Sequence, residues 1–144
     1  MISIGKLQPE DRADWQVLFA GYCEFYGRTL PSELVDRAWT AFREDTLMHA
    51  LGAKLDGKLV GITHFLTHVS TTSQDSCYLQ DLFTAPEARG LGVARALIAE
   101  VTDWARAQNC SRVYWSTQET NATARRLYDQ VAENHGFILY RIDL

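Results

Sequence analysis

The sequence is poor in cysteine and in clustered metal-binding residues. Its three cysteines, Cys23, Cys77 and Cys110, are scattered and form no Cys-x-x-Cys pair. An odd, unspaced set predicts reduced thiols in a cytoplasmic protein and argues against a disulfide framework or a zinc site. His64 and His68 are four residues apart on a predicted strand but have too few further ligands nearby for zinc, so we expect no metal.

Long apolar runs and strong basic charge are also missing. No run approaches the length that spans a membrane, and the N-terminus shows no basic region followed by an apolar stretch, so we expect neither a membrane segment nor a signal peptide. The net charge of −4 argues against a sequence-independent nucleic-acid binder and suits small cationic substrates. A chain of 144 residues predicts one domain over residues 1–144.

Two common phosphate-binding motifs are absent from the most distinctive stretch. An apolar and aromatic strand is predicted at Tyr78–Thr84, and a long amphipathic helix is predicted from Leu91. The turn between them, Arg89–Ala94, lacks the Gly-Lys-Ser/Thr of a P-loop and the third glycine of the dinucleotide fingerprint. A glycine turn that opens a helix still presents unpaired N–H groups at the positive end of the helix dipole, which favours phosphate binding.

The rest of the chain alternates between strand and helix signals. Asp56-Gly57 between two strand-like runs predicts a hairpin, and Asn121 predicts the start of a short helix. The predicted strands are 2–7, 48–55, 58–66, 78–84, 112–116 and 137–140, and the predicted helices begin near residues 9, 31, 91 and 121. The order βααβββαβαβ predicts an α/β domain with a mixed central sheet flanked by helices.

Several of these motifs resemble the GCN5-related N-acetyltransferases. Arg89–Ala94 fits the family's Arg/Gln-x-x-Gly-x-Gly/Ala motif, and the strand before it and the segment Asn121–Phe137 follow in the family's order and spacing. Within the family, Gly21–Tyr26 and Tyr114–Ala124 are most similar to the histone/polyamine-acetyltransferase-like branch.

The resemblance implies acetyl-CoA as co-substrate and assigns residues to it. Leu82, Phe83 and Thr84 would pair through their backbone with the pantetheine arm, and Asn121 would touch that arm with its amide. The pyrophosphate would be held by backbone amides of Arg89, Gly90, Leu91, Gly92, Val93 and Ala94.

The resemblance also implies the catalytic groups. Tyr128 would protonate the departing thiolate of CoA. Gln80 stands where polyamine-type members carry a glutamate, and because glutamine cannot accept a proton, we expect a water-relayed proton assisted by Glu119 or Asp81. The aromatic end of the first helix, at Tyr22, Phe25 and Tyr26, is expected to wall a substrate pocket together with Gln80.

The resulting hypothesis is an acetyl-CoA-dependent N-acetyltransferase that acts on a primary amine of a small molecule, such as a polyamine or an amino acid, in a ternary complex. Two alternatives stay open at this point. One is acetylation of protein lysines or N-termini, and the other is a non-catalytic acyl-CoA-binding module that regulates a partner. The family also implies a homodimer, with residues 137–144 as the expected interface.

Overall fold

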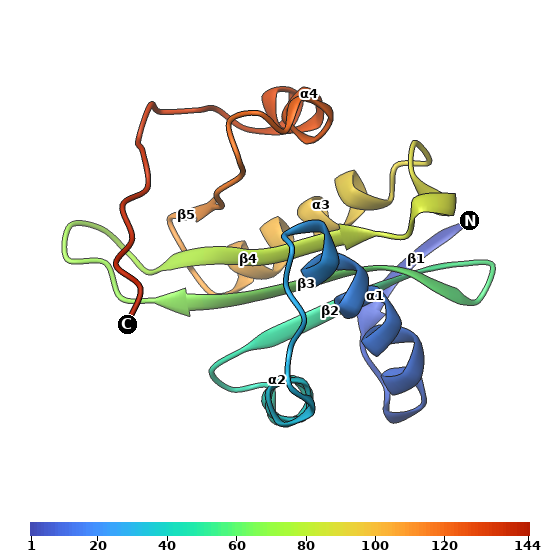
Figure 1. Ribbon diagram of the computed structural model, residues 1–144. Coiled ribbons are helices and arrows are strands. Elements are labelled where there is room, and N and C mark those ends of the chain that lie inside the picture. The colour runs from blue at the N-terminus through green and yellow to red at the C-terminus, as the bar shows by residue number, and fades with distance from the viewer. The chain divides into compact units, whose positions relative to one another are not determined.

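The chain builds a five-stranded sheet with helices on both faces, followed by a shorter C-terminal part (Figure 1). The computed structural model describes all residues 1–144, in two units, Met1–Tyr114 and Trp115–Leu144. The first unit contains β1 (Ile2–Lys6), the 3-10 turn η1 (Pro9–Asp11), α1 (Arg12–Phe25), α2 (Ser32–Glu44), β2 (His49–Leu55), β3 (Lys58–His68), β4 (Ser76–Thr84), η2 (Pro86–Ala88), α3 (Val93–Ala107) and β5 (Arg112–Tyr114). The second unit contains α4 (Ala122–Val131).

The sheet is mixed, as the sequence predicts. Its strands lie in the order β1-β2-β3-β4-β5, and every neighbouring pair is antiparallel except β4 and β5. The hairpin between β2 and β3 turns at Asp56 and Gly57, which both have positive φ, the conformation that favours Asp-Gly in a two-residue turn. The parallel pair β4–β5 needs a long crossover, which α3 supplies.

Helices α1 and α3 cover opposite faces of the sheet. Adjacent side chains of a strand point to opposite faces, and β3 shows this at His64 and Phe65. His64 packs beside Trp15 of α1, whereas Phe65 meets Trp104 of α3 in an edge-to-face contact with ring centroids 4.8 Å apart. In Figure 1, α1 accordingly lies in front of the sheet and α3 behind it. Trp15, His64 and Phe65 are fully or almost fully buried, so this contact layer is the core.

The predicted last strand is wrong. Residues 137–140 form no strand, and the last regular element of the chain is α4. The side chains of Phe137, Ile138, Leu139 and Tyr140 are exposed. Alternating apolar residues indicate that a segment can be a strand, but a strand also requires a partner whose backbone completes the hydrogen bonds. No such ladder forms here. The order is therefore the predicted one without its final strand.

A glycine in β3 sets how closely α3 approaches the sheet. A Cβ added at Gly61 would lie 2.5 Å from Val93 Cγ1 and 3.2 Å from Leu97 Cδ1. Val93 is the first residue of α3, so the absent side chain lets the start of this helix rest directly on the sheet. Gly61 also pairs with Thr84 at the end of β4. The close contact of Gly61 with Val93 therefore holds the start of α3 near the end of β4.

Replacing Gly61 by Ala is expected to overpack this contact and to lower the free energy of unfolding by about 1–3 kcal/mol. Gly5→Ala is the matched control, because a Cβ at Gly5 would meet nothing within 4 Å and should change stability by no more than about 0.5 kcal/mol. Urea denaturation measures both. Equal midpoints for the two variants would contradict the packing described here.

Candidate functional site

Strand β4 is paired along only part of one edge. Its β3 side is hydrogen bonded as far as Thr84, but its β5 side pairs only over Ser76–Tyr78, opposite Arg112–Tyr114. β5 ends at Tyr114, opposite Tyr78, whereas β4 continues to Thr84. Because the outward backbone N–H and C=O groups of β4 beyond Tyr78 have no strand partner, they are available to an extended ligand. The expected pantetheine-binding residues Leu82, Phe83 and Thr84 all lie on this open stretch.

A β-bulge interrupts β4 at Gln80. His64 of β3 pairs with Asp81 and Phe65 pairs with Leu79, so Gln80 is the extra residue between them. A bulge bends its strand and breaks the simple alternation of side chains between the two faces. The Gln80 side chain is exposed, and Asp81 is half-buried against α1.

The carboxylate of Asp81 is held by partners from α1 and β3. Its Oδ2 lies 2.9 Å from His64 Nδ1, and the Tyr22 hydroxyl donates a hydrogen bond to it. Burial and the nearby Asp81 charge together raise the pKa of Tyr22 far above its ordinary value, so Tyr22 stays protonated as a donor. The backbone is fixed as well, since Thr63 Oγ1 donates to the Asp81 carbonyl at 2.9 Å. The structure therefore brings Asp81 together with the aromatic end of α1.

The three aromatic residues predicted to wall a pocket form a cluster. The Tyr22 and Tyr26 ring centroids are 5.1 Å apart, and Phe25 meets Tyr26 edge-to-face at 5.0 Å. Burial, then the Asp81 charge, also raises the pKa of Tyr26, which places this ring near the same carboxylate. Phe25 and Tyr26 are 56% and 38% exposed, so the cluster opens to solvent beside Asp81. This combination of a carboxylate and aromatic rings suits a cationic amine.

The turn before α3 is open at the positive end of the helix. Gly90 and Gly92 both have positive φ, and a Cβ added at either would meet nothing within 4 Å. Gly92 is the N-cap and offers no side-chain acceptor, and the Ala96 N–H is bonded to the Gly92 carbonyl at 3.0 Å. The N–H groups of Val93 and Ala94 precede that bond and belong to the orphan set of a helix start.

Arg89 connects this turn to the end of β4. Its Nε donates to the Thr84 carbonyl at 3.2 Å, and its guanidinium lies over the Phe83 ring, 5.5 Å from the centroid. Phe83 in turn lies against α1, where a Cβ added at Gly21 would be 3.0 Å from the ring. The strand residues expected to bind the pantetheine arm and the turn expected to bind the pyrophosphate are therefore adjacent in the first unit.

The remaining predicted residues lie in the second unit. Asn121 caps α4 as predicted, with its Oδ1 accepting from the Ala124 N–H at 3.4 Å. Glu119 is exposed, and its carbonyl accepts from Arg125. Tyr128 is half-buried and meets Trp115 edge-to-face, with centroids 5.4 Å apart.

Sequence reasoning missed two residues of this site. His64 and Trp15 are both 0% exposed and hydrogen bonded to each other, with Trp15 Nε1 3.0 Å from His64 Nε2. A histidine within the apolar run of β3 was the available signal, because a fully buried histidine requires hydrogen-bond partners. The sequence pattern by itself indicates only that this histidine lacks the further ligands of a zinc site.

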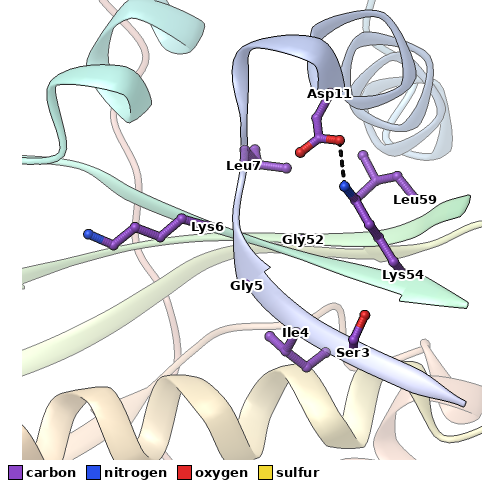
Figure 2. A pocket seen from close by; sticks show the side chains of 9 residues that line it. All are labelled: Ser3, Ile4, Gly5, Lys6, Leu7, Asp11, Gly52, Lys54 and Leu59. Carbon is purple, nitrogen blue, oxygen red and sulfur yellow. Dashed lines mark ion pairs between the residues drawn. The ribbon is translucent and has the colours of Figure 1, made fainter. Parts of the chain in front are cut away.

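A separate polar hollow of about 130 Å³ lies at β1 (Figure 2). Gly5 of β1 is paired there with Gly52 of the neighbouring strand β2. Lys54 Nζ lies 2.9 Å from Asp11 Oδ1. Burial opposes ionisation of Asp11, but the Lys54 ammonium and the Gln8 N–H outweigh it and lower the pKa of this carboxyl. The two charges satisfy each other, and none of the predicted site residues lines the hollow.

Other proteins are similar to this chain in sequence and in fold. The sequence model of the Acetyltransferase (GNAT) family matches residues 15–132. The D-amino-acid N-acetyltransferase HPA3 of Saccharomyces cerevisiae is 30% identical over 97% of this chain and 89% of its own length.

Two solved structures have a closely similar fold. The ribosomal-protein-alanine N-acetyltransferase of Brucella melitensis biovar Abortus superposes with a TM-score of 0.83 at 26% identity, over 100% of this chain and 99% of its own. AAC(6')-Iy, in complex with the bisubstrate analogue CoA-S-monomethyl-acetylneamine, superposes with a TM-score of 0.88 at 17% identity, again over 100% and 99%.

Proposed function

The chain belongs to the Acetyltransferase (GNAT) family and is an N-acetyltransferase, and we propose that it transfers the acetyl group of acetyl-CoA to a primary amine of a small molecule such as an amino acid or a polyamine. The observation that carries the choice of acceptor is the Asp81 carboxylate beside the aromatic cluster of α1. The yeast relative named for D-amino acids supports a small acceptor, as does the complex of AAC(6')-Iy with an analogue that joins CoA to acetylneamine.

The chain's own residues fit acetyl-CoA. The open edge of β4 at Leu82–Thr84 would pair with the amides of the pantetheine arm, and the N–H groups of Arg89–Ala94 would hold the pyrophosphate. The helix dipole of α3 would contribute about 0.3–1 kcal/mol to phosphate binding. Asn121, as the cap of α4, would keep its amide for the same arm.

The reaction is direct transfer in a ternary complex. The neutral amine attacks the thioester carbonyl, backbone N–H groups of β4 stabilise the oxyanion, and the carbon–sulfur bond then breaks. The amine loses its proton to Asp81, directly or through water, and Tyr128 gives a proton to the thiolate. Asp81 is a better acceptor than Glu119, because two side chains orient its carboxylate whereas Glu119 is exposed. Gln80, exposed on the bulge, would contact the substrate without taking a proton.

The proposal also includes the extent of the domain, the oligomeric state and the location of the protein. The family match runs from residue 15 to residue 132 and so includes parts of both units, which supports one acetyltransferase domain over residues 1–144. The exposed apolar side chains of residues 137–142 support a homodimer that buries this segment. No helix of the structure is long and apolar enough to cross a membrane. A cytoplasmic location remains part of the proposal.

Protein acetylation is the second candidate, because the Brucella structure at 26% identity is named for a ribosomal protein. Incubation with acetyl-CoA and a panel of D- and L-amino acids, spermidine, neamine and a peptide with N-terminal alanine separates the two, with free thiol as the readout. We expect a small amine to release thiol at least tenfold faster than the peptide.

Asp81→Asn, which keeps the shape of the side chain but accepts no proton, should abolish most of this signal. Turnover of the peptide alone, or of no amine, would overturn the proposal.

Tyr128→Phe is expected to lower kcat by about 10²–10⁴-fold with little change in the KM for acetyl-CoA, because it removes a general acid but keeps the aromatic ring. The control is Tyr114→Phe, which removes the same hydroxyl from a residue of β5 that is bonded to His68 outside the predicted site, and which should leave both constants unchanged. Steady-state kinetics with the best amine of the panel give the answer. An unaltered kcat would remove Tyr128 from the mechanism.

A further inference from the structure

A continuous chain of hydrogen bonds leads from the core to the carboxylate of Asp81. Trp15 of α1 donates through Nε1 to His64 Nε2 at 3.0 Å, and His64 Nδ1 lies 2.9 Å from Asp81 Oδ2. Trp15 and His64 are both 0% exposed, whereas the Asp81 side chain keeps 14% of its surface exposed. This series of hydrogen bonds therefore begins in the buried core and ends at the partly exposed carboxylate of the candidate site.

The geometry fixes which nitrogen of His64 carries hydrogen. The indole N–H of Trp15 can only donate, so His64 Nε2 must accept with its lone pair. A neutral imidazole then has its hydrogen on Nδ1, which donates to Asp81. An imidazolium would place two N–H groups against each other at the bond with Trp15. Trp15 thus holds His64 as a neutral donor toward Asp81.

We propose that His64 and Trp15 are positioning residues for the proton acceptor Asp81. They orient its carboxylate and close the core side of the site to protons. This inference rests on the proposed function, in which an amine loses its proton to Asp81. Since Nδ1 already carries hydrogen and Nε2 is occupied, a proton that reaches Asp81 cannot pass on to His64. It must leave through the exposed part of the carboxylate.

The surroundings of His64 support this direction of proton movement. Rings of Phe19 and Phe42 pack against the imidazole, with centroids 5.3 and 4.2 Å from it. Its opposite residue on β2 is the apolar Ala50. Charged and titratable groups near these hydrogen bonds include Asp81 from β4, Tyr22, Tyr26, Cys23 and Arg12 from α1, and Asp36 from α2, which is ion-paired with Arg12. Burial, followed by the Asp81 charge, raises the pKa of Cys23, so this thiol also stays neutral.

Trp15→Phe tests the inference, because it keeps an aromatic ring in the core and removes the donor to His64. Without that donor, the Nε2 lone pair of His64 is free to accept a proton. The resulting imidazolium would pair with Asp81 and prevent it from accepting a proton. We expect kcat/KM of the variant to fall about tenfold relative to wild type at pH 5.5 and to approach wild type at pH 8.5. Trp39→Phe is the matched control, since its ring also packs on Trp15 but donates no hydrogen bond to His64.

A second readout needs no substrate. In an NMR spectrum, the His64 ring should carry its hydrogen on Nδ1 alone in wild type and in Trp39→Phe, whereas Trp15→Phe should no longer hold Nε2 as the unprotonated nitrogen. If Trp15→Phe does not fold, His64→Asn, which keeps an N–H donor but cannot titrate, should retain at least tenfold more kcat than His64→Leu.

The outcomes distinguish a failure of the proposed positioning role of His64 and Trp15 from a failure of the proposed acetyltransferase function. A hydrogen on His64 Nε2 in wild type overturns the inference whatever the activity. Robust acetylation with the same pH profile in wild type and Trp15→Phe overturns it too, and leaves the proposed function in place. If no amine of the panel is acetylated, the proposed function is overturned and, with it, the role of His64 as a positioning residue.

Discussion

The one-sided pairing of β4 is the constraint on which the site depends. β3 holds one edge of the strand to its end, and β5 leaves the other edge after Tyr78. Open backbone groups at an edge are costly unless water or a ligand satisfies them. Here the open stretch ends at η2 and the glycine turn, so one path along the backbone passes from the edge of β4 to the start of α3. The close fit of Gly61 against Val93 fixes the two ends of that path relative to each other.

The bulge at Gln80 connects this path to the chemistry. It lies where the ladder with β3 is irregular, and it directs Asp81 toward α1. The carboxylate then meets a histidine whose other nitrogen is used by a buried tryptophan. A buried polar chain of this kind is expensive to break, because removing one member leaves another without a partner, at about 1–3 kcal/mol per group. The same chain therefore contributes to the rigidity of the core and to the orientation of the site.

The sequence predicts most of the fold because its signals are local. Asp56-Gly57 specifies a hairpin, Asn121 a helix cap, and Gly90 and Gly92 a turn that only residues tolerant of positive φ adopt readily. The features it does not predict depend on partners distant in the chain. The bulge at Gln80 requires the register with β3, and the role of His64 requires Trp15, which is 49 residues away. The alternating segment 137–140 shows the converse, since strand propensity alone does not supply a partner.

The central claim is that the start of α3 binds the phosphates of CoA, and calorimetric titration of CoA into two glycine variants tests it most directly. Gly92→Ala and Gly57→Ala introduce the same side chain at φ values of 87° and 85°, both in open space, so the backbone strain is matched. Only Gly92 lies in the proposed phosphate turn. We predict that Gly92→Ala weakens CoA binding about tenfold or more, which corresponds to about 1.4 kcal/mol, whereas Gly57→Ala leaves the Kd unchanged at a similar loss of Tm. Equal Kd values for the two variants would contradict the account.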